Sequence, residues 1–456
     1  MYRAKPLKDS NGCCCGVRSW ISSLIISAFL STVVWAQHGP GTEDLRGPEG
    51  AYVAYDAVIL PGPTADSFAV DIHYRIQQSF FVFMRTSTGK EEAQGEVLVE
   101  LNNTSGEATA REVRSIRLDR PNQPASGALI PDHQDHVRFV LPPGTYTIVL
   151  DVRAQESGRR FLERRRTLEI LAMPEGSLLP RPVFGFLETA VGAFVPFNRG
   201  GGCRFGAVGG MLVHFRPYSN GPQVLSWKLS GMSDEDGSAR ADFSGIDTVS
   251  VGQMYIPDVS NDRPEYRQVP AENWGSAYVR LPLERLEPGP YTIETALSEG
   301  ASKVSQTYRL MVFWPDRPLS LTTFDLAVDA LRHIADPEEV EDMVGFFADG
   351  GGERFREFWR RLDPDTATMY NPAQAEYYRR VDEAIRKFST RGGNDGYKTD
   401  RGRILILYGS PTTSQRIFKP NIGPREIWVY EHLKKRFIFT DPDRTGNYTL
   451  TQTEDL

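Results

Sequence analysis

The sequence predicts a multidomain protein with two all-β, immunoglobulin-like sandwiches followed by an α+β C-terminal domain, in which helices precede a small antiparallel sheet. Three observations lead to this prediction. Apolar and polar residues alternate along much of residues 52–170, and a Pro-Gly-x-Tyr-Thr-Ile unit occurs twice. From Pro318 onward the apolar residues recur at helical spacing. A chain of 456 residues is long enough for about three domains.

Residues 1–36 are expected to form a signal peptide. Four basic residues precede or begin an apolar run at 20–36, and Val34 and Ala36 supply the small side chains of a cleavage site. The run contains five Ser/Thr residues and is short for a membrane-spanning helix. Cleavage near Ala36 would give a periplasmic or secreted protein with a flexible leader at 37–50. The alternative is an uncleaved membrane anchor.

Charge and cysteine content narrow the range of partners. The N-terminal segment carries four basic residues and one acid, so its removal changes the net charge from −7 to −10. A chain this acidic has no general attraction to nucleic acid or anionic lipid, and no nucleic-acid partner is expected. Three of the four cysteines leave with that segment, so Cys203 has no intramolecular disulfide partner.

The first predicted sandwich covers residues 51–173. Residues 67–76 alternate between apolar and polar side chains, which is typical of a strand with one face on a core and one in water. Similar but looser alternation follows at 96–101 and 111–118. Several short strands separated by turn signals favour a β-sandwich.

The second predicted sandwich covers residues 180–315, and a repeat supports it. Residues 137–150 are echoed by 279–294, and each copy contains a Pro-Gly turn followed by Tyr-Thr-Ile. Tyr146 and Tyr291 occupy the position that a corner tyrosine often takes in immunoglobulin-like sandwiches. The repeat therefore predicts architecture but no ligand.

The predicted C-terminal domain covers residues 319–456. Asp336 and Glu339 form a capping box around Pro337, and Asn371 precedes Pro372 at the start of another amphipathic helix. A Gly-Gly break follows these helices. The small antiparallel sheet is then expected to consist of strands at 403–408, 426–431 and 436–441.

A Gly-bracketed polar segment, Gly396–Arg403, precedes the first of these strands. With its surroundings it resembles the GWxTD domain, a bacterial family without an established biochemical role, over roughly residues 353–450. The resemblance implies a family without implying an activity, and Tyr397 stands where the family has tryptophan. The matching residues are Phe358-Trp359, Asp363-Pro364, Asn371, Tyr378–Val381, Ala384, Phe388, Gly396, Thr399–Arg403, Tyr408-Gly409, Pro411, Glu426–Trp428, Tyr430, Phe437 and Phe439.

The segment has two interpretations, and the sequence leaves both open. In the structural one, Gly396 and Gly402 adopt positive φ while Thr399 and Asp400 bond to nearby backbone amides, as in tight turns. In the functional one, Asp400 and neighbouring side chains bind a ligand or partner. The tentative binding residues in this segment are Tyr397, Thr399, Asp400 and Arg401.

The stretch from Gly409 to Arg425 is expected to be a loop of about 17 residues joining two strands. Loops this long are usually functional or disordered. Arg416, Lys419 and Arg425 give this one a positive charge on an acidic chain, so they join the tentative binding residues. The pattern is equally compatible with a loop that docks an acidic partner and with a solvent-exposed loop that has no partner.

Familiar catalytic, metal and cofactor motifs are absent from the sequence. There is no Gly-x-Ser-x-Gly elbow, phosphate-binding loop or His-Glu-x-x-His. His133 and His136 lie among carboxylates, but zinc needs three or four protein ligands, so a surface loop is expected at 132–136.

We therefore predict an exported protein without catalytic residues, metal or cofactor. It would be a binding or scaffold component that contacts envelope proteins or glycan, and it would touch the membrane only through an uncleaved N-terminus. The alternative is an extracytoplasmic hydrolase with a carboxylate-based site near Asp400, which requires a closed cleft. The sequence does not indicate an oligomeric state.

Overall fold

The structure is a computed structural model. The expected signal peptide at 1–36, its cleavage site near Ala36 and the leader at 37–50 lie outside the residues that it describes. None of the helices in the described part of the chain has the length and hydrophobicity needed to cross a bilayer. The described residues are 52–64, 66–87, 89–120, 132–197, 201–231, 242–249, 251–258, 265–345, 351–389, 393–419 and 422–456.

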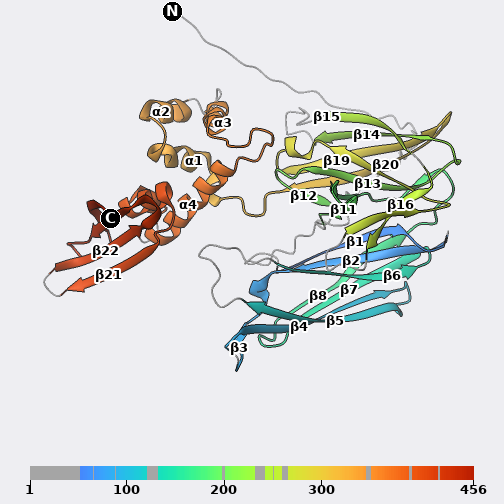
Figure 1. Cartoon of the computed structure of the whole chain (residues 1–456), viewed down its shortest axis with the longest axis horizontal. Coiled ribbons are helices and arrows are strands. Elements are labelled where there is room, and N and C mark those ends of the chain that lie inside the picture. Colours follow the sequence, from blue (N-terminus) through green and yellow to red (C-terminus); the bar gives the residue numbers. More distant parts are fainter. Residues whose placement is uncertain are drawn as a thin grey trace, which may run out of the picture. The chain divides into compact units, whose positions relative to one another are not determined.

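The described chain is mostly β-sheet, with a few helices and a small antiparallel sheet near the C-terminus (Figure 1). The first eight strands form two sheets, β1-β2-β6 and β3-β4-β7-β8, with β5 paired to β4. One hydrophobic core joins these two sheets. The strands are β1 (Val53–Pro61), β2 (Phe68–Ile76), β3 (Met84–Arg85), β4 (Glu91–Asn102), β5 (Ala108–Arg120), β6 (His133–Leu141), β7 (Gly144–Ala154) and β8 (Arg160–Ile170), and a 3-10 turn, η1, covers Gln78–Phe80.

The β1-β2-β6 sheet is buried on both faces. Val70 on β2 packs in the core shared with β4 and β7, whereas Ala69 packs with Phe194 and Tyr266 of later strands. The alternation at 67–76 predicted that one face of this strand lies in water, and that prediction is wrong. A second group of strands covers that face, so its polar side chain Asp71 is fully buried.

The later strands form two further sheets, ordered β16-β17-β11-β10-β13-β18, with β9 beside β13, and β12-β20-β19-β14-β15. A second core joins them. These strands are β9 (Ser177–Leu178), β10 (Val183–Glu188), β11 (Ala193–Pro196), β12 (Gly202–Arg204), β13 (Gly209–Arg216), β14 (Gln223–Gly231), β15 (Asp242–Val249), β16 (Gln253–Asp258), β17 (Glu265–Pro270), β18 (Gly275–Leu281), β19 (Gly289–Glu299) and β20 (Ser302–Phe313), with η2 at Leu283–Arg285.

The two copies of the repeat make the same contact. The Tyr146 hydroxyl donates to the carbonyl oxygen of Pro142 at 3.0 Å, and the Tyr291 hydroxyl donates to that of Glu287 at 3.0 Å. Each tyrosine therefore bonds to the backbone four residues upstream, at the turn that precedes its strand. Both side chains are buried in their cores.

The C-terminal helices agree with the helical spacing that the sequence shows. The Asn371 side chain accepts a hydrogen bond from the Gln374 backbone N–H at 2.9 Å and so caps α4, as predicted. The elements are η3 (Leu319–Thr322), α1 (Phe324–Ala330), η4 (Leu331–His333), α2 (Pro337–Gly345), α3 (Gly351–Arg361), α4 (Pro372–Phe388), η5 (Gly396–Lys398) and α5 (Asp400–Tyr408).

The predicted strand at 403–408 is wrong, because these residues belong to helix α5. The apolar run Ile404–Ile406 is buried and contributes to the third hydrophobic core, and α5 contacts both α4 and β24. A short apolar run buried on all sides has the same sequence pattern in a helix as in a buried strand, so periodicity alone cannot distinguish the two.

The C-terminal sheet is antiparallel, and the predicted strands at 426–431 and 436–441 are confirmed to within a few residues. The predicted loop at 409–425 is wrong: most of it forms a hairpin of β21 and β22, with a bulge between Ile417 and Lys419. The strand order is β21 (Thr413–Lys419), β22 (Ile422–Tyr430), β23 (Lys435–Thr440) and β24 (Thr449–Asp455), with η6 at Glu431–Leu433.

Candidate functional site

The Gly396–Arg403 segment is the corner at which α4 leads into α5. It forms the 3-10 turn η5, and Thr399 then caps α5. The Thr399 hydroxyl accepts a hydrogen bond from the Gly402 N–H at 3.0 Å and donates one to the Gly396 carbonyl at 2.8 Å. This is an N-cap, which satisfies a backbone donor that the first helical turn would otherwise leave free.

The two glycines of this corner are needed for close approach and not for unusual backbone angles. Neither Gly396 nor Gly402 has a positive φ, so that part of the structural interpretation is wrong. A Cβ on Gly402 would lie 2.1 Å from the Gly396 carbonyl oxygen, and one on Gly396 would lie 2.3 Å from the Ala384 carbonyl oxygen. The corner therefore places backbone directly against backbone.

Tyr397 points its ring into the third core and its hydroxyl toward α1. The side chain is 3% exposed, and its hydroxyl donates to the Asp329 carboxylate, which also pairs with Lys398 Nζ at 2.8 Å. Burial alone raises the pKa of Asp329, but hydrogen bonds from Lys398, Tyr397 and Arg332 outweigh it and hold that pKa at about 2. Burial, and then the bond to Asp329, raise the pKa of Tyr397.

Arg401 forms a buried ion pair with Glu426 of β22. Its Nη1 donates to Glu426 Oε2 at 3.1 Å, and its Nη2 donates to the Gly446 carbonyl at 2.9 Å. The guanidinium carbon lies 4.7 Å from the ring centroid of Phe388 and 4.3 Å from that of Tyr448, within cation–π range. This side chain is therefore engaged from several directions by β22, Phe388 and the segment at 446–448.

Asp400 has hydrogen-bond and ion-pair partners other than Arg401. Its Oδ2 accepts a hydrogen bond from the Leu450 backbone N–H of β24 at 2.8 Å, and its Oδ1 lies 3.4 Å from Arg403 Nη2. The four tentative motif residues thus reach different places: Tyr397 reaches α1, Thr399 its own corner, Asp400 β24 and Arg401 β22. They do not form one cluster open to a ligand.

Glu426 is a key residue that the sequence-based selection missed. It accepts from Trp428 Nε1 at 2.9 Å as well as from Arg401, and Arg416 Nε lies 3.4 Å from its Oε2. The structure thus brings together two of the tentative residues, Arg401 and Arg416. The sequence could have indicated that Glu426 is buried. Glu426, Trp428 and Tyr430 are spaced two residues apart on one strand, so they lie on the same face, which is buried.

The other two tentative residues of the hairpin lie apart from Glu426. Arg425 is exposed and faces the opposite side of β22 from Glu426. Lys419 ends β21, where its Cα is paired with that of Ile422, and its side chain lies outside the described residues. The hairpin residues therefore do not converge on a single site.

The predicted surface loop at 132–136 is also wrong, because β6 begins at His133. Asp135 accepts a hydrogen bond from the Tyr74 hydroxyl at 3.0 Å, and the His136 ring stacks on His73 with 5.3 Å between centroids. Within the described residues, no three His, Cys, Asp or Glu side chains gather as a metal-binding group would.

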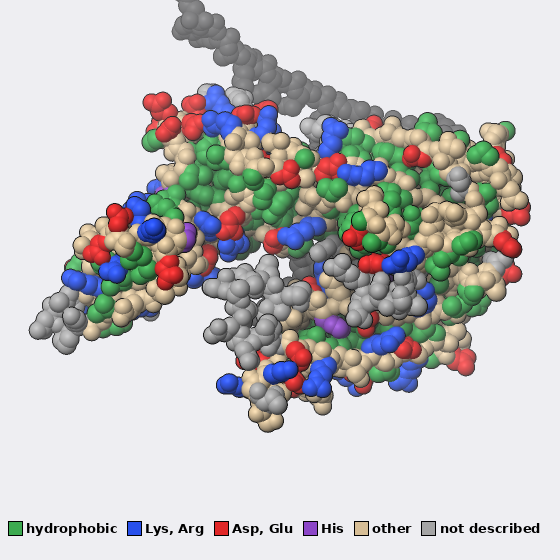
Figure 2. Space-filling model, in the orientation of Figure 1, with side chains coloured by type: hydrophobic (Ala, Val, Ile, Leu, Met, Phe, Trp, Pro, Cys, Tyr) green, Lys and Arg blue, Asp and Glu red, His purple; other side chains and the backbone are tan. Residues whose placement is uncertain are grey.

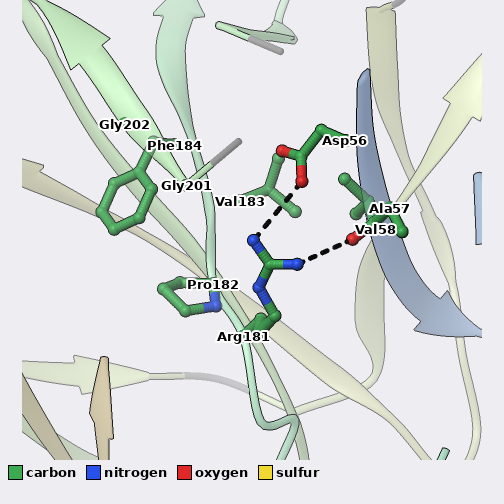
Figure 3. Close-up of a pocket in the computed structure, with 9 residues that line it drawn as sticks. All are labelled: Asp56, Ala57, Val58, Arg181, Pro182, Val183, Phe184, Gly201 and Gly202. Carbon is green, nitrogen blue, oxygen red and sulfur yellow. Dashed lines mark hydrogen bonds and ion pairs between the residues drawn. The ribbon is translucent and has the colours of Figure 1, made fainter. Parts of the chain in front are cut away.

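Basic and acidic side chains are interspersed on the face seen in Figure 2, so the visible described surface has no broad patch of one sign. A small cavity lies beside Arg181, and Figure 3 shows this side chain pointing at Asp56. Its Nη2 lies 3.4 Å from Asp56 Oδ1, and its Nη1 donates to the Ala57 carbonyl at 3.1 Å. The cavity holds about 20 Å³, which is room for about one water molecule. It is a packing gap at a polar contact and not a ligand pocket.

Comparison with protein families assigns the C-terminal part of the chain to a family. Residues 294–455 match the family described as the GWxTD domain, a longer stretch than the 353–450 covered by the sequence resemblance. No match was found among curated proteins. Among solved structures, a crystal structure of red sea bream transglutaminase aligns with 12% identity and a TM-score of 0.16. That alignment covers 57% of this chain and 31% of the transglutaminase chain, and its TM-score is too low to support an argument about fold or activity.

Proposed function

We propose that this chain, which belongs to the GWxTD domain-containing family, is an exported, non-catalytic binding or scaffold component of a cell envelope. It acts through contacts with envelope proteins or glycan. Residues 1–36 direct its export and are cleaved near Ala36, leaving a periplasmic or secreted protein. This proposal includes no cofactor, metal or nucleic-acid partner.

The engagement of the motif side chains carries the proposal. Thr399 caps a helix, Asp400 bonds to β24, and Arg401 is held by Glu426. Groups that act on a substrate must present a free donor, acceptor or nucleophile to it. These groups instead bond within their own domain, which supports a structural motif and favours binding elsewhere on the surface. The same bonds weigh against the alternative of a hydrolase site near Asp400.

We also propose that residues 51–173 and 180–315 are immunoglobulin-like sandwiches and that residues 319–456 are a separate module. The matching hydrogen bonds of Tyr146 and Tyr291 support the first part, because a corner tyrosine recurs in such sandwiches. Sandwiches commonly present loops and edge strands to partners. Edge strand β15 suits this role, since its Ile246 side chain is 75% exposed.

Chemical cross-linking in intact cells tests the proposed function. Cells that express the chain are treated with a membrane-impermeant, amine-reactive cross-linker, and the cross-linked products are identified by mass spectrometry. We expect a recurrent adduct with an envelope protein or with an envelope glycan that carries free amines, and a mature N-terminus at Gln37. A variant that lacks residues 1–36 is the control and should form no adduct. Recovery of the intact chain in the cytoplasm would contradict the proposal.

A further inference from the structure

A groove on the C-terminal helices is separate from every residue discussed so far. It lies between α4 and the segment that runs from η3 into α1, and it measures about 750 Å³. This volume is within the range of ligand-binding pockets, roughly 300–1,000 Å³. In Figure 2 hydrophobic side chains gather on the surface over α1.

The apolar part of the groove comes from three side chains. Leu326 and Ile385 are half-buried and pack against the third core, while Leu319 is 76% exposed. A single exposed leucine is ordinary on a protein surface. Here it stands at a concavity that has two further aliphatic side chains, so an apolar group placed in the groove would cover all three.

The acidic side chains that line the groove are already engaged. Asp382 accepts hydrogen bonds from the backbone N–H groups of Leu319 at 2.6 Å and Ser320 at 2.9 Å. Glu383 pairs with Lys387 at 2.6 Å. Neither carboxylate is therefore free to bind a cationic ligand.

The two arginines that line the groove differ from each other. Arg379 forms a two-point ion pair with Glu376, with N–O distances of 2.8 and 2.9 Å. Arg386 is exposed, and within the described part of the chain it forms no ion pair. The groove thus combines an aliphatic surface with one cation, Arg386, that no carboxylate of the described residues pairs.

We infer that this groove binds an extended segment of a partner protein in which an aliphatic or aromatic side chain lies next to an Asp or Glu. The inference rests on the proposed binding function and names its docking site. The apolar side chain packs on Leu319, Leu326 and Ile385, and the carboxylate forms a two-point pair with Arg386.

The rim of the groove suits a peptide backbone. Thr322, Thr323 and Asn394 line it and are exposed. The Thr322 hydroxyl donates to the Leu319 carbonyl at 2.6 Å and can still accept, whereas Thr323 and Asn394 can both donate to and accept from main-chain amides. An anionic membrane surface is disfavoured, because the groove offers one cation without a carboxylate partner among the described residues and the chain is acidic overall, whereas a single peptide carboxylate needs only that cation.

Selection from a random heptapeptide display library on the purified chain tests this inference. We expect the selected peptides to contain Leu, Ile, Phe or Trp beside Asp or Glu. Synthetic copies of them should bind Arg386→Glu and Leu319→Ser at least tenfold more weakly than the wild type, and Arg386→Lys should recover part of the loss. Arg309→Glu, which reverses another exposed arginine on β20, should bind as the wild type does.

Both groove side chains are exposed, so the variants should melt at the wild-type temperature. Peptides without an acidic residue, or peptides that bind Arg386→Glu as tightly as the wild type, would overturn the inference. The cross-linking experiment separates the two proposals. If either of these peptide results is obtained while cells that express Arg386→Glu still form the envelope adduct, the groove assignment is wrong and the proposed function stands. If cells that express the wild-type chain form no envelope adduct, the proposed function itself is contradicted.

Discussion

The guanidinium of Arg401, in the first turn of α5, donates to the carboxylate of Glu426 on β22 at 3.1 Å. Both side chains are almost completely buried, with 9% and 5% exposed. The pair ties α5, the helix that follows the Gly396–Arg403 corner, to the middle of the C-terminal sheet. Arg401 therefore joins helix α5 to the C-terminal sheet.

Replacing Thr399 tests the cap of α5. Thr399→Ala removes the hydroxyl that accepts from the Gly402 N–H and should destabilise the domain by about 1 kcal/mol. Thr399→Ser keeps the oxygen and should lose much less. Hydrogen exchange of the α5 amides measures the local effect, and equal exchange in the two variants would contradict the capping role.

Gly402→Ala tests the close approach at the corner. On helix propensity alone this change would stabilise α5 by roughly 1 kcal/mol. The new Cβ would lie 2.1 Å from the Gly396 carbonyl oxygen, so we expect a loss of about 1–3 kcal/mol instead. Gly352→Ala in α3 is the matched control, because its Cβ meets no atom within 4 Å and should stabilise. Urea unfolding followed by tryptophan fluorescence distinguishes the two signs.

Asp329→Asn tests the anchor of Tyr397. The pKa of Asp329 is about 2 in the folded chain, below its ordinary value of 3.8, so its carboxylate stabilises the fold above pH 4. That contribution is lost as pH falls from about 4 to 2. We expect the variant to be less stable by roughly 1 kcal/mol near pH 7, after allowance for solvent screening. The gap from wild type, measured by urea unfolding, should close near pH 2; a constant gap would contradict this.

His73 should make the β1-β2-β6 sheet acid-sensitive. Burial, the largest cause, lowers its pKa to about 4 from an ordinary 6.5; Asp71 opposes this shift and His136 adds to it. The unfolded chain binds the proton more readily, so stability falls as pH drops from 6.5 to 4, by roughly 3 kcal/mol in total. His73→Gln removes this titration, so its melting temperature should fall less between pH 7 and pH 4.5. If the melting temperature of His73→Gln falls as much as that of the wild type, titratable groups other than His73 cause the acid sensitivity.

The sequence was sufficient to predict those parts of the structure that depend on residues close together in the chain. Asn371 before Pro372 predicted a capped helix start, and the Asn371 side chain makes that cap. The repeated Pro-Gly-x-Tyr unit predicted equivalent turns, and Tyr146 and Tyr291 make equivalent bonds. In both cases the interacting groups lie within four residues of each other.

The sequence was insufficient to predict those features that depend on contacts between distant parts of the chain. Ile404–Ile406 suit a buried strand or a buried helix, and contacts with α4 and β24 accompany the helix. Asp71 alternates with apolar neighbours as a solvent-facing residue would, yet another sheet covers it. The pairing of Arg401 with Glu426, 25 residues apart, depends on how α5 lies on the sheet and has no local signature.

A double-mutant cycle on Arg401 and Glu426 tests the central claim most directly, namely that the motif acts structurally. The variants are Arg401→Met, Glu426→Gln and the double mutant, with the free energy of unfolding of the C-terminal domain as the readout. Arg401→Met leaves buried Glu426 without its buried cation, with Trp428 Nε1 and the exposed Arg416 among its remaining partners, and Glu426→Gln leaves buried Arg401 without its carboxylate partner. Each single change should therefore cost about 3 kcal/mol. The double mutant should cost clearly less than the sum, because no unpaired charge remains. Single variants that keep wild-type stability but lose the envelope adduct would contradict the claim and make Arg401 a binding residue.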